Sequence, residues 1–455
     1  MTRLTVLFAL ILAADVTNAV AQSPSPPQLP PPSPTAFANV EMPSWVRIGI
    51  EHRGRLEGPI GTGFAADRED LYWLNRFRVT ARFSIKPWLS AAVQAQDARV
   101  EGRNGPVAGA PFRDQFDLRL AHADVGNLER SRLALRVGRQ ELAFGDQRLV
   151  GHVSWLNTAR SFDAVRGVFR HGKVRVDGFA ASVVTLQVGG FNWSGAGNYF
   201  YGADAPLAVL PLGGVLEPYE FVRMTRNQRT DAGANATLVS STTGVRLAGK
   251  LSPVIDYNIE AAIQRGSLGE DDIAAWAGHW VVGRTISIGR ATWRVFGEYN
   301  YASGDDTPGD GQRGTFDQLY PTPHDKYGLA DQVGWKNIHH VRTGLEFQPQ
   351  PKLALGGGYH SFWLASASDA LYNAGGTAIA RMPPGLGAVA DQAKAARHVG
   401  QELDIQATFT PSPRIQVHGG YSHMFTGAFL DAATPGKSYS GPYVMVTTML
   451  LGMER

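Results

Sequence analysis

The stretch NRFRVTARFSI, residues 75–85, alternates between polar and apolar side chains along its whole length. In an extended strand, such alternation places the apolar set from Phe77 to Ile85 on one face and the polar set on the other. Arg76, Arg78 and Arg82 belong to the polar face. The run is longer than the roughly five or six residues of a usual soluble strand. It therefore predicts a long strand that separates an apolar environment from a polar one.

The same alternation recurs along the chain, most clearly at 116–120, 133–137, 255–264 and 399–409. Many of the runs have roughly nine to twelve residues, close to the length that a tilted strand needs to cross a membrane. A soluble β-sandwich would bury the apolar faces inside the protein. A membrane barrel turns them toward lipid and keeps polar residues in the lumen. Strand length favours the barrel.

Connection lengths support this interpretation. Strands at about 45–53, 72–85, 88–98, 115–124, 132–139, 162–170 and 173–184 are joined by alternately long and short connections. Such alternation is typical of a barrel with extracellular loops and short periplasmic turns. Residues after 241 give nine further strands, and residues 185–241 hold either no hairpin or one. The sequence predicts an all-β transmembrane antiparallel barrel of 16 or 18 strands, and we expect 18, with Pro218 as the weak point of the extra hairpin.

Composition limits the other classes of protein. The 455 residues include no cysteine, which excludes a disulfide scaffold, a zinc ribbon and a cysteine nucleophile. A net charge of +3 gives no reason to expect nucleic acid as a partner. Arg3, the apolar run 4–14 and Ala19-Val20-Ala21 have the order of a secretion signal. We expect a signal peptide at 1–21, a Pro-rich linker at 22–43 and one barrel domain at 44–455, with no cofactor.

The central segment GRQELAFGDQRLVGHVSWLNTARSFDAVRGVFRHGKVRVDGFAAS, residues 138–182, resembles the signature of the bacterial alginate export family of outer-membrane proteins. Its G-R-Q-E-L, G-D-x-R-L-x-G, W-x-N and F-D-x-V-R elements occur in the family's order. The resemblance implies a monomeric 18-stranded barrel in the bacterial outer membrane. It also implies that an anionic polysaccharide passes outward through an arginine-lined pore.

A pore for polyuronates needs fixed positive charges, and arginine suits this role because its planar guanidinium binds carboxylate with two hydrogen bonds. By strand parity, the polar faces carry nine arginines: Arg76, Arg78, Arg82, Arg119, Arg132, Arg136, Arg166, Arg175 and Arg246. Two interpretations remain open for each of them. The arginine either concentrates anions in the lumen or pairs across strands with Asp117, Asp163, Asp177 or Glu298 as a structural ladder. For the cluster as a whole we favour selectivity.

The family-like segment supplies further candidates. Arg139, Arg148, Arg160 and Asp163 lie on or beside a long connection that we expect to fold inward and set the constriction. Arg139 has the apolar parity of its strand, so a lumenal position requires a bulge or a strand end there. Alternatively, Arg148 with Asp146 simply fixes the loop. Outside this segment, the acidic stretch 304–311 is expected to be a solvated loop rather than a Ca²⁺ site.

The sequence thus predicts a passive channel for an alginate-like polysaccharide or oligosaccharide, embedded in outer-membrane lipid and with periplasmic export proteins as candidate partners. The alternative is a general or uptake porin for small anions or uronate oligomers, which would share the fold. An outer-membrane enzyme is the weaker alternative, because the chain has neither a G-x-S-x-G nor an H-E-x-x-H motif. An Asp-His-Ser set inside the barrel is left open by spacing alone.

Overall fold

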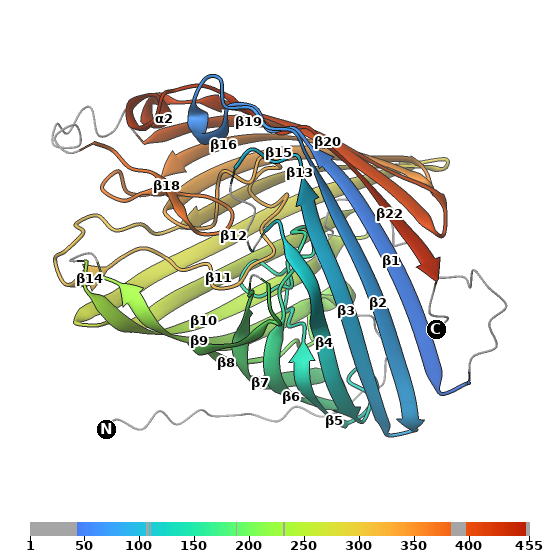
Figure 1. Ribbon diagram of the computed structural model, residues 1–455. Helices are drawn as coiled ribbons and strands as arrows, with labels where there is room; N and C mark the ends of the chain where they lie inside the picture. The colour runs from blue at the N-terminus through green and yellow to red at the C-terminus, as the bar shows by residue number, and fades with distance from the viewer. Residues whose placement is uncertain are drawn as a thin grey trace.

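The computed structural model describes residues 43–105, 109, 111–187, 189–230, 233–383 and 397–451, so the expected signal peptide and nearly all of the linker lie outside it. Eighteen antiparallel strands form a closed barrel (Figure 1). Pairing of the last strand with the first closes the wall. In order around the wall these strands are β1 (Val46–Glu57), β2 (Tyr72–Lys86), β3 (Leu89–Glu101), β4 (Asp114–Val125), β5 (Leu133–Gln140), β6 (Phe162–His171), β7 (Val174–Thr185), β8 (Trp193–Asp204), β9 (Val215–Arg229), β10 (Asn235–Ser252), β11 (Ile255–Leu268), β12 (Asp271–Ile288), β13 (Ala291–Ala302), β15 (Ile338–Gln350), β16 (Leu353–Leu364), β19 (His398–Ser412), β20 (Ile415–Thr426) and β22 (Tyr443–Leu451).

Long and short connections alternate from β1 to β7 and from β13 to β22, as the sequence predicts, and the long ones gather at one end. Between β7 and β13 the alternation is lost, because the connections 253–254, 269–270 and 289–290 are all tight turns. By analogy with outer-membrane barrels this is the extracellular end. The long connections carry the small elements of the fold: β14 (Gln312–Arg313), β17 (Leu371–Tyr372), β18 (Ala378–Ala380), β21 (Tyr439–Ser440), the short helix α2 (Ala428–Ala433) and the 3-10 turn η1 (Thr62–Phe64). A second 3-10 turn, η2 (Pro211–Gly213), lies in the connection between β8 and β9.

The expected extra hairpin is formed by β8 and β9, which confirms a barrel of 18 strands. Pro218 is tolerated because the β8–β9 ladder ends at Asp204 and Tyr219, just before it. Its carbonyl oxygen still accepts a hydrogen bond from the Ala205 amide. On its other side it pairs in register with Val245 of β10. The proline therefore lies near a ladder end, where a missing N–H donor costs little.

The apolar parity of the strands faces outward. Phe77, Val165 and Ile405, for example, are 39%, 47% and 64% exposed, whereas Arg76 and Arg78 on the opposite face of β2 are buried in the interior. Among the described residues, no helix is both long enough and apolar enough to cross a membrane.

The interior differs from a uniformly polar lumen. The connections 141–161 and 303–337 turn into the barrel (Figure 1) and pack there against inward-facing aromatic residues of the wall. Phe162, Phe179, Phe200 and Phe221 of β6 to β9 belong to this apolar cluster and are 9% exposed or less. The inward side of β6 to β9 therefore provides an apolar surface against which the two connections pack. We call the connections 141–161 and 303–337 the inner loops.

Candidate functional site: the cationic lumen

Three arginines of the first hairpin hold the inner loop 141–161 against the wall. Arg53 Nη1 donates to the Ser154 carbonyl over 2.7 Å, and Arg55 Nη1 donates to that of Trp155 over 2.6 Å. Arg76 Nη1 reaches the same Ser154 carbonyl at 3.0 Å. All three guanidinium groups hydrogen-bond to main-chain oxygens, so Arg76, the member of this group that the sequence predicts as a pore residue, positions the loop.

Trp155 joins the two inner loops. The Arg55 guanidinium lies over its ring, 3.8 Å from the centroid. His324 of the other inner loop stacks parallel to the same ring at 3.5 Å. Tyr443 of β22 meets the ring edge-on. The indole is thus enclosed by a cation, an imidazole and a phenol, which ties both loops to the seam where the barrel closes.

Polar residues of the family-like segment complete this attachment. The Asn157 side-chain amide donates to the carbonyls of Asn75, Arg99 and Phe112, which belong to three separate parts of the chain. Arg160 Nη1 donates to the carbonyls of Gly151 and Pro321, the latter on the other inner loop. Burial lowers the pKa of Arg160 to about 10, so it remains charged at neutral pH.

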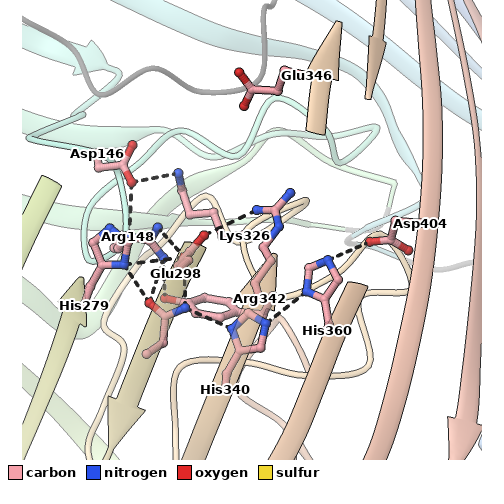
Figure 2. A network of polar contacts seen from close by, with 12 residues as sticks. Asp146, Arg148, His279, Glu298, Lys326, His340, Arg342, Glu346, His360 and Asp404 are labelled. Atoms are coloured by element: carbon pink, nitrogen blue, oxygen red, sulfur yellow. Dashed lines mark hydrogen bonds and ion pairs between the residues drawn. The ribbon is translucent and has the colours of Figure 1, made fainter. Parts of the chain in front are cut away.

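A buried ionic network joins the inner loops to the far wall (Figure 2). Arg148 Nη2 lies 3.0 Å from Glu298 Oε1 on β13, and its Nη1 donates to the Tyr327 hydroxyl at 3.2 Å. Asp146 pairs with Arg148 at 3.1 Å and with Lys326 at 3.3 Å. Although burial opposes ionisation, these two cations lower the pKa of Asp146 to about 2. The alternative role for Arg148, fixing the loop, agrees with this geometry.

Three histidines extend the network along the wall. His279 Nδ1 contacts Asn300 Oδ1 at 2.7 Å, and Asn300 Nδ2 contacts His340 Nδ1 at 2.9 Å. His340 then meets His360, whose Nε2 lies 3.2 Å from Asp404 Oδ2. The imidazole of His360 therefore contacts the carboxylate of Asp404 on one side and the imidazole of His340 on the other. In the described part of the chain, no group of acidic and histidine side chains is arranged to hold a metal ion.

A large cavity lies in the half of the barrel with the short turns, mainly against β1 to β6. It measures about 820 Å³ and we call it the vestibule. Five arginines of the predicted set line it together: Arg78, Arg82, Arg119, Arg136 and Arg166. With Lys86 they make six cationic side chains, against the four carboxylates Glu51, Asp124, Glu129 and Glu141. The lining therefore carries an excess of positive charge.

Most of the vestibule arginines have carboxylate partners. Arg136 Nε bonds Asp124 at 2.7 Å, and Arg166 Nη2 bonds Asp177 at 2.5 Å. Arg119 pairs with Glu141 of the inner loop. Burial disfavours ionisation of Glu141, but the charge of Arg119 lowers its pKa to about 2. The expected ladder therefore exists at these positions.

Arg82 is different. It is exposed in the vestibule, and its partner in register across the β1–β2 pair is Arg47, another arginine. Within the described residues, neither guanidinium has a carboxylate within ion-pair distance. Like charges directly opposite each other destabilise a sheet, so this pair contributes positive charge to the mouth of the barrel at a cost in stability.

Other predicted residues lie elsewhere. Arg139 and Asp163 face outward, contrary to the expectation of a pore position, because β5 pairs with β4 and β6 without the bulge that Arg139 would need. They bond each other at 2.8 Å and 3.1 Å. Arg246 is buried and pairs with Glu217 at 2.5 Å. Arg175 pairs with Asp177 at 2.5 Å. Arg132 lies in the turn before β5.

Sequence reasoning missed Arg53, Arg55 and Lys326 as interior cations. The first two share the inward parity of Arg47 on a strand that extends to Glu57, beyond its predicted end. Applying the same alternation over the full strand finds both of them. Lys326 gives no such signal, because it lies in an irregular inner loop.

Comparison with known proteins agrees with this architecture. The model of the alginate export family matches residues 44–443. The OccK11 (OpdR) structure of Pseudomonas aeruginosa has a TM-score of 0.58 at 11% identity, with coverage of 91% of this chain and 99% of that one. OpdK of the same organism gives 0.59 at 11% identity, with 89% and 98% covered. A BenF-like porin of Pseudomonas fluorescens Pf-5 gives 0.56 at 10%, again with 89% and 98% covered.

No curated protein sequence matches the chain. The structural neighbours are outer-membrane porins, and at these identities they establish the fold alone. The family match covers nearly the whole barrel domain and agrees with the closed 18-stranded wall. The protein is a β-barrel of the bacterial outer membrane and belongs to the alginate export family.

Proposed function

We propose that the protein is a passive channel for anionic saccharides of the polyuronate type, with the vestibule as its selective element. The observation that supports this proposal is the vestibule lining, in which six cationic side chains face four carboxylates. Cations fixed in a confined aqueous space raise the local concentration of anions. The interspersed carboxylates weaken binding at any one position, which a conducting pore requires.

The structural ladder accounts for Arg119, Arg136 and Arg166, whose charges are balanced by acids. It does not account for the Arg47–Arg82 pair, since two adjacent arginines destabilise the wall they belong to. We therefore assign selectivity chiefly to these unbalanced charges and to Lys86, which lines the vestibule together with Arg82. The ladder keeps the wall rigid around them.

The test is single-channel recording in planar bilayers with the full-length protein. A salt gradient gives the permeability ratio of anions to cations, and oligouronates of increasing length are then added to either side. We expect anion selectivity and concentration-dependent block by oligouronates. Cation selectivity, or the absence of conductance from a folded barrel, would contradict the proposal.

Uptake of small carboxylates is the second candidate. It is favoured by the inner loops, because their apolar cluster with the wall fills part of the interior and narrows the path for a polymer. One of the matched structures is OpdK with vanillate, a small carboxylate. If monouronates cross the channel while long oligouronates only block it, the uptake function is the correct one.

A further inference from the structure

A second cavity lies at the extracellular end, on the opposite side of the inner loops from the first hairpin. It measures about 330 Å³ and is enclosed by β9 to β12, the inner loop 303–337 and part of the connection 365–397. Its charged lining consists of five cations, Arg160, Arg223, Arg229, Arg313 and Lys336, and one carboxylate, Asp317. This lining is more strongly cationic than that of the vestibule.

The single carboxylate is already engaged. Arg223 Nη1 donates to Asp317 Oδ2 at 2.7 Å, and the Asp317 main-chain N–H bonds Gln264 of the wall. Arg160 uses its guanidinium on main-chain carbonyls, which accept hydrogen bonds without cancelling its charge. With five cations and one carboxylate, the charged groups of the cavity lining therefore carry a net positive charge.

Lys336 is the most informative of these cations. Its Nζ lies over the Tyr372 ring, 4.4 Å from the centroid. Among the described residues, no carboxylate lies within ion-pair distance of it. Burial lowers its pKa more than the charges of Asp317 and Asp369, which lie beyond ion-pair distance, raise it, and this reflects the cost of a buried ammonium with no carboxylate in contact. An anion entering the cavity would relieve this cost.

Ser240 provides an independent observation. This residue of β10 lines the same cavity and is 1% exposed. Its Oγ has no hydrogen-bond partner within the described part of the protein. A buried hydroxyl without a partner is costly, and a hydroxyl donor beside a cation is well suited to an oxygen-rich anionic ligand.

We propose that this cavity is a binding site for one hexuronate unit at the extracellular mouth, with Lys336 as counter-ion of the carboxylate and Ser240 as a hydrogen-bonding partner. Its volume lies at the lower end of the roughly 300–1,000 Å³ typical of small-ligand pockets, which fits one sugar unit rather than a polymer strand. The choice of a uronate rests on the proposed function. The presence of an anion site rests on the cavity alone.

The experiment is calorimetric titration of the full-length protein in detergent micelles with sodium D-glucuronate, and with D-glucose and sodium sulfate as comparison ligands. Loss of a charged hydrogen bond costs about 1.5–3 kcal/mol, so Lys336→Gln should weaken glucuronate binding by at least about tenfold. Lys336→Arg should recover most of the affinity, and Ser240→Ala should weaken binding by about threefold or more. Lys437→Gln, an exposed lysine in another extracellular connection, is the matched control and should bind like the unmodified protein.

Each outcome is decisive. Unchanged glucuronate affinity in folded Lys336→Gln, or no glucuronate binding to the unmodified protein, overturns the site. Sulfate binding as tight as glucuronate, with the same loss in Lys336→Gln, overturns the uronate assignment and leaves a general anion site. Binding of glucuronate by a barrel that is not anion-selective in bilayers would contradict the proposed function while supporting the site. Anion selectivity without glucuronate binding would contradict the site while supporting the proposed function.

Discussion

Neutralising Arg82 is the sharpest test of the vestibule as a selective element. Arg82→Gln removes one positive charge from the cavity wall, and it leaves no carboxylate without its partner in the described structure. The neighbouring Arg47 is relieved of a like charge in register with it, so the barrel should fold at least as well as before. Any change in permeation then reflects the lost charge rather than a damaged wall.

The magnitude follows from the size of the cavity. A sphere of 820 Å³ has a radius of about 6 Å, so a monovalent ion at its centre interacts with a wall charge by about 0.7 kcal/mol in water. At physiological ionic strength, where the Debye length is about 8 Å, screening reduces this to about half. The substitution removes this attraction for an anion and the equal repulsion for a cation, so the permeability ratio of anions to cations should fall about threefold.

The assay is the reversal potential in a salt gradient, measured for Arg82→Gln and for a matched control. Arg290→Gln makes the same substitution in an exposed turn at the same end of the barrel, but at β12–β13 and outside the vestibule lining. The control should keep the original permeability ratio. Equal ratios for both variants and the unmodified channel would refute the electrostatic role of the vestibule.

Three further predictions concern the wall and the inner loops. Gly138→Ala should lower the free energy of unfolding of the barrel by about 2 kcal/mol or more, because φ is +118° and a Cβ would overlap the Ala121 carbonyl oxygen. The folded fraction is measured by heat-modifiable gel mobility, and the control Gly167→Ala, with open space around the new methyl group, should fold normally. The pKa of Asp146 is depressed to about 2, so its stabilising contribution is complete above its unfolded value of about 3.9 and is lost only as pH falls through about 2. Titration of Asp146 should therefore leave conductance unchanged between pH 7 and pH 5. Asp146→Asn, in contrast, should increase conductance and current noise at both pH values. Identical current traces for the variant and the unmodified protein would contradict the attachment of the loop by Asp146. Trp155→Ala should likewise raise conductance, because it removes the ring between Arg55 and His324, and an unchanged current would show that the stack does not restrict the path.

Strand parity predicted which side chains of the wall face lipid and which face the interior, because successive residues of a barrel strand alternate between the two sides. Phe77 must face outward once Arg76 and Arg78 face inward, and the register of β1 with β2 carries that choice to the next strand. Connection lengths supplied the topology, and the β8–β9 hairpin followed from the need for an even number of strands between the two counted halves. Even Pro218 fits, since it lies where the β8 ladder ends.

The interior could not be predicted in the same way, because it depends on irregular segments with no period. Nothing local indicates that Phe200 and Phe221 face a loop rather than lipid, since an inward aromatic residue and an outward one look alike in sequence. The partner of Arg148 is Glu298, 150 residues along the chain, and only the path of the inner loop brings them together. For Arg139, strand parity correctly indicated an outward-facing side chain, and the expected pore position was wrong.

The family-like segment and the two cations on which our proposals chiefly rest, Arg82 and Lys336, are different parts of the protein. Asn157 and Arg160 spend their hydrogen bonds on main-chain carbonyls, and Arg148 is enclosed by Asp146 and Glu298. These residues hold the inner loop in place, and Arg160 in addition lines the extracellular cavity. Arg82 and Lys336, which lack carboxylate partners among the described residues, lie outside the segment 138–182 that resembles the family signature. The family-like segment therefore holds the inner loop in place, and the two cations without carboxylate partners to which we assign anion binding lie outside it.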